Sequence, residues 1–212
     1  MLQVERFTFN VLEVNTYVVY DATKDCAIID PGCLTAAEKK RLSSFIKTHG
    51  LQVKHLINTH CHIDHILGNR YVKNNYAVQL AIHAQEITNL QLAPSHAPQL
   101  GILGYEPTEA AIFLRSGDMI QIGNSNLVVL EVPGHSPGHI ALYSQKDQLC
   151  LVGDVLFRGA IGRTDLPGGN YDSLIESIYQ KLFPLGDQVT VYPGHGLPTT
   201  LGQEKFKISR LL

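Results

Sequence analysis

The chain has 212 residues, of which 44% are hydrophobic and 17% charged, and its formal net charge at pH 7 is −2. This length suits a single domain with a large buried core, and the composition argues against long disordered segments. The charge pattern has no basic stripe, which argues against nucleic-acid binding, and no apolar run is long enough to span a membrane. We therefore expect one domain over residues 1–212.

The cysteines and the N-terminal residues indicate the cellular compartment in which we expect the protein. Cys26, Cys33, Cys61 and Cys150 are widely spaced and form no Cys-x-x-Cys pair, which suits free thiols in a reducing compartment. Residues 1–7 alternate polar and apolar side chains as a strand does, without the basic and apolar regions of a signal peptide. We expect a cytoplasmic protein.

The first half of the chain alternates strand and helix patterns. Thr35 followed by Glu38 is the pattern of a capping box, so we expect a helix that begins there and ends at Gly50. In chain order, the predicted elements are strands at 3–9, 15–21 and 26–29, this helix, a strand at 53–58, a helix from 68 or 69 to 76, and a strand at 78–82.

The second half begins with a proline-containing stretch. Residues 92–110 hold Pro94, Pro98 and Pro107, which predicts an irregular segment, either a lid over a site or a plain connector. The elements predicted after it are strands at 119–122, 127–131, 141–144 and 148–152, a helix at 171–182, a strand at 189–192 and a short helix near 203–210. This order predicts the α/β class, and a four-layer αββα sandwich is one arrangement that accommodates it.

A dense group of potential metal ligands follows the predicted strand at 53–58. Three histidines and one aspartate fall within the six residues from His60 to His65. Imidazole and carboxylate groups are preferred ligands of zinc and similar ions, and sites often form where strands end. We interpret this segment as part of a metal site, because a solvated polar loop would not require so many ligands.

Three further donors stand just after predicted strands, and each is preceded by a glycine that permits a sharp turn. The resulting seven donors exceed what one tetrahedral ion binds and suit two ions that share a ligand. The predicted ligands are His60, His62, Asp64, His65, His135, Asp154 and His195.

These donors can be divided between two ions. An extended loop would point His60 and His62 the same way. We assign these two residues to one ion together with His135, and we assign Asp64, His65 and His195 to the other, with Asp154 between the ions.

The other histidines and Cys61 receive structural interpretations. We expect His139 to brace the ligand loop by hydrogen bonding and Cys61 to be a packing residue. The histidines not expected to be ligands are His49, His55, His83 and His96.

The charge of such a site predicts its chemistry. Two divalent ions outweigh two carboxylates and a bridging hydroxide, so the centre should attract an anionic substrate. Hydroxide would attack a polarised carbonyl or phosphoryl group. Asp64 would orient this nucleophile and take up protons, which makes Asp64 and Asp154 the candidate catalytic residues. Zn²⁺ is the ion we expect, and iron or manganese would also accept these ligands.

The order of these motifs resembles the metallo-β-lactamase superfamily over almost the whole chain. The resemblance rests on His60-Cys61-His62-Ile63-Asp64-His65 followed by His135, Asp154 and His195. It implies the αββα sandwich with a dinuclear site at one edge. Asp154 occupies the place where true β-lactamases carry a cysteine or lack a bridging carboxylate, so the resemblance does not imply antibiotic hydrolysis.

Within this superfamily the chain resembles the glyoxalase II branch, especially its short bacterial type. The matching segments are Asp30-Pro31-Gly32 and residues 133–139 and 153–157. This implies hydrolysis of a small anionic thioester of the S-lactoylglutathione type. Arg163 corresponds to a lysine that contacts glutathione in that branch, which implies substrate binding, unless Arg163 pairs with Asp165 instead.

Two other activities remain open on the same scaffold. One is a persulfide dioxygenase, which would hold a single iron through His60, His135 and Asp154. The other is a different hydrolase of the superfamily, such as a lactonase or phosphodiesterase. The complete second set of ligands favours hydrolysis over the dioxygenase reaction.

Overall fold

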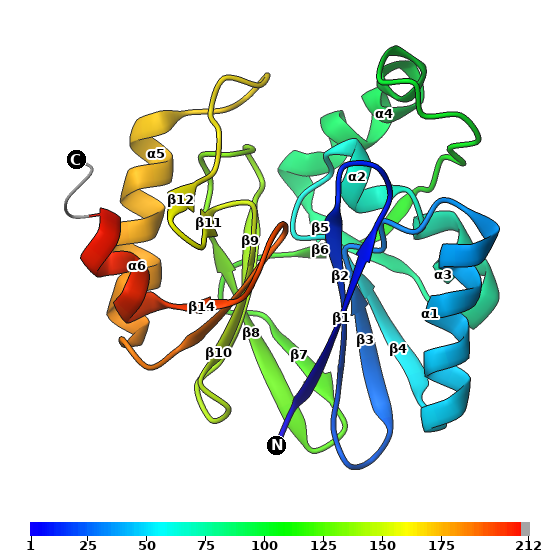
Figure 1. Ribbon diagram of the computed structural model, residues 1–212, viewed down its shortest axis with the longest axis horizontal. Helices are drawn as coiled ribbons and strands as arrows, with labels where there is room; N and C mark the ends of the chain where they lie inside the picture. The colour runs from blue at the N-terminus through cyan, green and yellow to red at the C-terminus, as the bar shows by residue number, and fades with distance from the viewer. Residues whose placement is uncertain (209–212) are drawn as a thin grey trace. The chain divides into compact units, whose positions relative to one another are not determined.

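The computed structural model describes residues 1–208 and contains two compact units. The first unit comprises Met1–Leu114 and Gln121–Asn126, and the second comprises Arg115–Ile120 and the residues from Leu127 onward. Each unit has its own sheet and helices (Figure 1). That residues 1–212 form one domain stays a prediction.

The six strands of the first sheet lie side by side in the order of the sequence. They are β1 (Gln3–Phe9), β2 (Val14–Tyr20), β3 (Asp25–Ile29), β4 (Gln52–Ile57), β5 (Leu80–His83) and β6 (Ala110–Leu114). The first three strands pair antiparallel, whereas β3 to β6 pair in parallel. The carboxyl ends of β3 and β4 therefore meet at one edge, where ligand sites of such sheets form.

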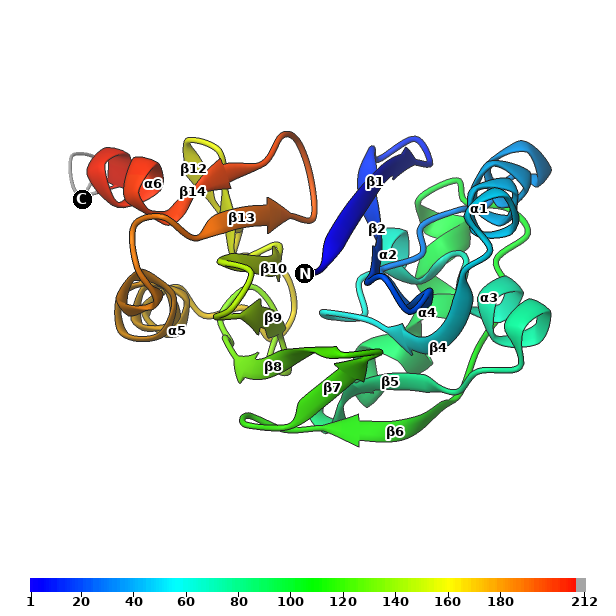
Figure 2. The same ribbon diagram turned by 90° about the horizontal axis from the view of Figure 1, so that it is seen from below.

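Helices of the first unit cover this sheet. They are α1 (Ala36–His49), the short α2 (Ile63–Ile66), α3 (Asn69–Tyr76), the 3₁₀ turn η1 (Ala84–Glu86) and α4 (Ile87–Gln99). Figures 1 and 2 show α1 and α3 on the same side of β4. Leu42 of α1 and Val72 of α3 belong to one buried apolar cluster with Leu56 of β4, which holds these helices on the sheet.

The predicted ends of α1 are confirmed. The Thr35 side chain accepts a hydrogen bond from the Glu38 N–H, and the Glu38 carboxylate accepts one from the Thr35 N–H, which completes the capping box. The same carboxylate also accepts hydrogen bonds from the backbone N–H groups of Asn10 and Leu34, at 2.7 and 2.9 Å. Gly50 ends the helix in the left-handed conformation, with φ at 63°.

The expectation of an irregular segment at residues 92–110 is wrong for its first part. The helix α4 runs through Gln99 and contains Pro94 and Pro98. Its buried residues Leu90, Ala93 and Ala97 recur at helical spacing and pack into the core of the first unit. This packing outweighs the cost of proline inside a helix, about 3 kcal/mol for each such residue. The strand β6, which was not predicted, begins at Ala110.

The second sheet has the strand order β14-β13-β10-β9-β8-β7. These strands are β7 (Met119–Ile122), β8 (Ser125–Glu131), β9 (Ile140–Ser144), β10 (Leu149–Gly153), β13 (Thr190–Pro193) and β14 (Thr199–Thr200), and a separate hairpin is formed by β11 (Leu156–Phe157) and β12 (Ala160–Ile161). β10 and β13 pair in parallel, and the Gly194 N–H donates to the Gly153 carbonyl at 2.7 Å. The residues that follow these two strands are therefore neighbours.

Two helical segments pack on the second sheet. The first is α5 (Tyr171–Glu176), which continues as the π-helical segment η2 (Ser177–Leu182) and the 3₁₀ turn η3 (Phe183–Leu185), and the second is α6 (Leu201–Ile208). Leu174, Ile178 and Leu201 share a buried cluster with the strand residues Val152 and Val191. The helix predicted at 171–182 is thus present, and the predicted residues 209 and 210 of the last helix lie outside the described residues.

Each unit supplies one sheet layer and one helical layer, as the α/β expectation requires. Within residues 1–208, no helix has both the length and the apolar character needed to cross a membrane.

The hydrogen bonds of Glu38 lead to a stability prediction. Thr35→Ala removes one cap and should lower the free energy of unfolding by about 1 kcal/mol. Glu38→Ala leaves three N–H groups without their acceptor and should cost roughly 2–3 kcal/mol. Urea unfolding measures both values, with Lys40→Ala on the exposed face of α1 as the control. Equal stability of the Glu38→Ala and Lys40→Ala variants would contradict the role of this carboxylate.

Candidate metal centre

Four of the predicted ligands lie together after the end of β4 in the first unit. His60 and His65 are fully buried, and the centroids of their rings are 4.1 Å apart. The ring of His62 lies 4.7 Å from that of His60. Removing several polar imidazoles from water costs free energy, so buried imidazoles at such spacing are typical of a ligand cluster.

The local backbone departs in part from the expected extended loop. His62 is extended, with φ −66° and ψ 149°, but the next residues form the short helix α2. Asp64 and His65 therefore project from a helical turn, with 3.6 Å between Asp64 Oδ2 and His65 Nε2. A helix of four residues is too short to show its period in the sequence, which explains why it was not predicted.

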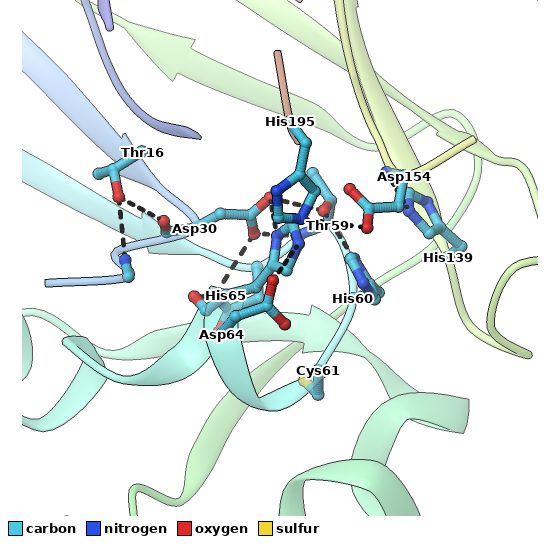
Figure 3. Close-up of polar contacts among 12 residues, drawn as sticks. Thr16, Asp30, Thr59, His60, Cys61, Asp64, His65, His139, Asp154 and His195 are labelled. Atoms are coloured by element: carbon cyan, nitrogen blue, oxygen red, sulfur yellow. Dashed lines mark hydrogen bonds and ion pairs between the residues drawn. The ribbon is translucent and has the colours of Figure 1, made fainter. Parts of the chain in front are cut away.

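A buried carboxylate, that of Asp30, orients two of these histidines (Figure 3). Asp30 Oδ2 lies 3.1 Å from His65 Nδ1 and accepts a hydrogen bond from Thr59 Oγ1 at 2.6 Å. Thr59 Oγ1 is in turn 3.1 Å from His60 Nδ1 and accepts from it, because its own proton goes to Asp30. Nδ1 of both imidazoles thus lies against Asp30 or Thr59, which leaves Nε2 of each ring as the candidate metal-binding atom.

The position of Asp30 is itself determined by its surroundings. Asp30 has φ +50°, in the left-handed region that non-glycine residues rarely adopt. Its backbone carbonyl accepts a hydrogen bond from Thr16 Oγ1, which also accepts from the Gly32 N–H. A side chain at Gly32 would overlap Val14 and crowd the Asp64 carbonyl oxygen. In the sequence, Asp30-Pro31-Gly32 served only as part of a family resemblance, so the role of Asp30 was missed.

The other three predicted ligands lie together in the second unit. Asp154 follows β10, His195 follows β13, and His135 lies in the loop between β8 and β9. Asp154 Oδ2 is 3.6 Å from His135 Nε2 and 3.5 Å from His195 Nε2. The carboxylate therefore lies beside both imidazoles.

Hydrogen bonds also orient the ligands of the second unit. His135 Nδ1 donates to the Arg163 carbonyl at 2.8 Å, which again leaves Nε2 as the candidate metal-binding atom. His139 is fully buried and its Nε2 accepts a hydrogen bond from the Asp154 N–H at 3.1 Å. The prediction that His139 braces this region is confirmed.

The loop that carries His135 is packed against the start of α5. The Gly134 carbonyl accepts a hydrogen bond from the Asn170 N–H at 2.7 Å, and the Pro133 carbonyl accepts one from Ser177 Oγ at 2.7 Å. Gly134 has φ +137°, and a side chain there would collide with the backbone of Leu174. Glycine at this position thus allows the loop to lie directly on the helix.

The side chain of Arg163 pairs with Asp165, which was one of the two expectations for this residue. Arg163 Nε and Nη2 donate to the two carboxylate oxygens of Asp165 at 2.7 and 2.6 Å. The hydrogen bonds from Arg163 lower the pKa of Asp165 to about 2, so the pair stays charged near neutral pH. Substrate binding by Arg163 stays a prediction.

Cys61 is a packing residue, as expected. Its side chain is buried, and burial, followed by the nearby charges of Glu86 and Asp30, raises the pKa of its thiol well above the ordinary value. The thiol is therefore protonated near neutral pH and is a poor nucleophile.

The donor set fits divalent metal ions. Two ligand atoms at a tetrahedral angle around one zinc ion lie roughly 3.4 Å apart. The nitrogen–oxygen separations within each unit, 3.5 to 3.6 Å, are close to this value. All seven predicted ligands belong to groups of histidine and aspartate side chains that could hold a metal ion.

Similarity to known proteins identifies the family. The model of the metallo-beta-lactamase superfamily matches residues 9–195. Hydroxyacylglutathione hydrolase GloC of Haemophilus influenzae is 34% identical over 206 residues, which cover 96% of this chain and 95% of that protein.

Two solved structures are similar over nearly their whole length. The crystal structure of BLEG-1 B3 metallo-beta-lactamase has a TM-score of 0.86 and 32% identity, covering 97% of this chain and 99% of that one. The crystal structure of TTHA1623 in a di-iron-bound form has a TM-score of 0.85 and 32% identity, with 95% and 97% covered.

The chain belongs to the metallo-beta-lactamase superfamily, whose members are generally metal-dependent hydrolases. The predicted α/β class and the metallo-β-lactamase fold are confirmed by these similarities.

The contacts of Asp30 predict an effect on metal binding. Asp30→Asn keeps the size of the side chain but removes the charge beside His65 and Thr59. We expect the affinity for Zn²⁺ to fall about ten- to a hundredfold, the usual cost of losing a group that orients a ligand. Competition with a chromophoric chelator measures this affinity.

Asp21→Asn is the matched control for this variant. Asp21 is also buried in the first unit, and it accepts hydrogen bonds from the Thr23 and Asn124 N–H groups. Its replacement should lower stability and leave metal affinity unchanged. Equal metal affinity of the two variants would show that Asp30 has no role in orienting ligands.

Proposed function

We propose that this chain hydrolyses small anionic thioesters of the S-lactoylglutathione type at a centre of two divalent metal ions. The observation that carries the proposal is the set of seven nitrogen and oxygen donors at strand ends, several of them oriented by hydrogen bonds. The 34% identity with a hydroxyacylglutathione hydrolase, over 96% of this chain, supports the choice of substrate.

We propose that the seven donors form a single dinuclear centre. One ion would be held by His60, His62 and His135, and the other by Asp64, His65 and His195. The near contacts within each unit support this division, because Asp64 and His65 are 3.6 Å apart and are assigned to the same ion.

Asp154 would be the shared ligand of this centre. Its Oδ2 lies within 3.6 Å of His135 and His195, which are assigned to different ions. A carboxylate between two such imidazoles suits a bridge between metals.

The charge of the ligands favours an anionic substrate. Five neutral imidazoles and two carboxylates leave two divalent ions with excess positive charge, which attracts anions. When bound, such ions lower the pKa of water towards about 7 and polarise a carbonyl group. Water is added across the C–S bond, and a carboxylic acid and a thiol are released.

Asp64 is proposed to orient the attacking water and take up its proton. Its Oδ2 lies beside His65, and its backbone carbonyl accepts a hydrogen bond from the Asn10 side chain. The backbone of Asp64 is thus held by Asn10, and its carboxylate lies beside the assigned ligand His65, within the proposed centre.

Zinc is the proposed metal, with iron or manganese as alternatives, because mixed nitrogen and oxygen ligands suit all three. The di-iron-bound form of TTHA1623, 32% identical to this chain, is a reason to examine iron. We also propose a cytoplasmic location, which the four buried thiols support.

Ligand substitutions test the proposed activity. We expect His62→Ala and Asp154→Ala to abolish hydrolysis of S-lactoylglutathione, because each removes a donor from the centre. The release of thiol is followed with a thiol reagent, and circular dichroism establishes that the variants fold. His96→Ala, on the exposed side of α4, is the control and should keep full activity. Turnover retained in both ligand variants would contradict the proposal.

Other substrates separate the alternative activities. The similarity to BLEG-1 B3 metallo-beta-lactamase makes a β-lactam one member of this panel, beside a lactone and a phosphodiester. A persulfide dioxygenase would instead consume oxygen with glutathione persulfide and would need only His60, His135 and Asp154. Oxygen uptake without thioester hydrolysis would replace the proposed function by this one.

A further inference from the structure

A cavity in the second unit adjoins the predicted metal ligands. It has a volume of about 710 Å³ and is lined by His135, Asp154 and His195. Its walls also include the apolar side chains Phe157, Ile161 and Leu197 and the cationic side chains Arg158 and Arg163. A cavity of this size holds a small ligand.

The two arginines of this cavity differ in their charge balance. Arg163 is compensated by the two hydrogen bonds that it donates to Asp165. Arg158 has no ion pair within residues 1–208. Arg158 is therefore the uncompensated positive charge of the cavity wall.

Arg158 stands on a hairpin that is held in place. It occupies the turn between β11 and β12, next to Gly159, whose N–H donates to Glu204 Oε2 at 2.6 Å. Glu204 is fully buried, and its Oε1 accepts a further hydrogen bond from Thr199 Oγ1 at 2.6 Å. A buried carboxylate of α6 thus fixes the turn that presents Arg158.

The same hairpin also contacts a predicted metal ligand. The ring of Phe157 lies edge-on to that of His195, with 6.3 Å between the centroids. The turn with Arg158 is therefore fixed on one side by Glu204 and placed beside the metal ligands on the other. Groups held in advance bind a ligand with less loss of entropy.

We propose that Arg158 binds a carboxylate on the thiol portion of the substrate, and that it determines the preference for anionic thioesters. This inference rests on the proposed function and assigns the carboxylate contact to Arg158, because Arg163 is already paired with Asp165. A guanidinium group binds a carboxylate through two parallel hydrogen bonds. The apolar wall formed by Phe157, Ile161 and Leu197 would contact the uncharged part of the same molecule.

Binding of S-methylglutathione tests this inference without turnover, because the thioether cannot be hydrolysed. We expect Arg158→Gln to raise the dissociation constant about tenfold, as for loss of a charged hydrogen bond, and Arg158→Lys to raise it less. Lys146→Gln removes the same charge from the exposed turn between β9 and β10 and should bind as the wild type does. Isothermal titration calorimetry measures each constant.

Equal affinity of the wild type and Arg158→Gln would overturn the inference, and so would an equal loss in Lys146→Gln. Failure of the wild type to bind S-methylglutathione would overturn it as well.

Kinetics with two substrates separate this inference from the proposed function. S-lactoylglutathione carries carboxylates on its thiol portion, whereas S-lactoyl-N-acetylcysteamine carries none. We expect Arg158→Gln to raise KM for the first about tenfold with little change in kcat, and to leave both constants unchanged for the second. A similar change for both substrates would overturn the role of Arg158. Tight, Arg158-dependent binding of S-methylglutathione without hydrolysis of either thioester would overturn the proposed function and leave the carboxylate contact of Arg158 standing.

Discussion

The Asp30 carboxylate determines how the first unit presents two of its candidate metal ligands. Asp30 contacts His65 directly and His60 through Thr59, so one buried carboxylate lies against the Nδ1 side of two imidazoles. Burying this carboxylate is costly unless its oxygens are satisfied, and the Thr59 N–H and hydroxyl groups supply that compensation. The left-handed backbone at Asp30 and the glycine at position 32 follow from the same requirement for close packing.

In the second unit, uncharged groups orient the candidate ligands. A backbone carbonyl, that of Arg163, orients His135, and the buried imidazole of His139 holds the backbone of Asp154. These contacts place the Asp154 carboxylate beside His135 and His195. The side chain of Arg163 is at the same time paired with Asp165 through two hydrogen bonds.

The local features of the fold could be predicted from the sequence. The capping box at Thr35 and Glu38 and the glycine end of α1 are formed by neighbouring residues, so their pattern is visible in the chain itself. The placement of the seven candidate ligands after strands could be predicted for the same reason, and their role as ligands stays a prediction. The helix through Pro94 and Pro98 could not, because packing of α4 against the core decides it.

The groups that orient the ligands were largely beyond sequence reasoning. Asp30 and His65 are 35 positions apart, and His135 and Arg163 are 28 apart, so each contact exists only after folding. Glu204 reaches Gly159 from 45 positions away. The bracing role of His139 was predicted because His139 lies near His135 in the chain. Contacts between residues close in sequence are therefore the ones that such reasoning can find.

The central proposal is that the seven candidate donors hold two metal ions. Elemental analysis of the protein purified without added metal, with protein concentration from amino-acid analysis, tests it most directly. The account predicts two divalent ions per chain, with zinc as the main element. A single ion per chain, iron in particular, would contradict the dinuclear centre and the hydrolytic chemistry derived from it.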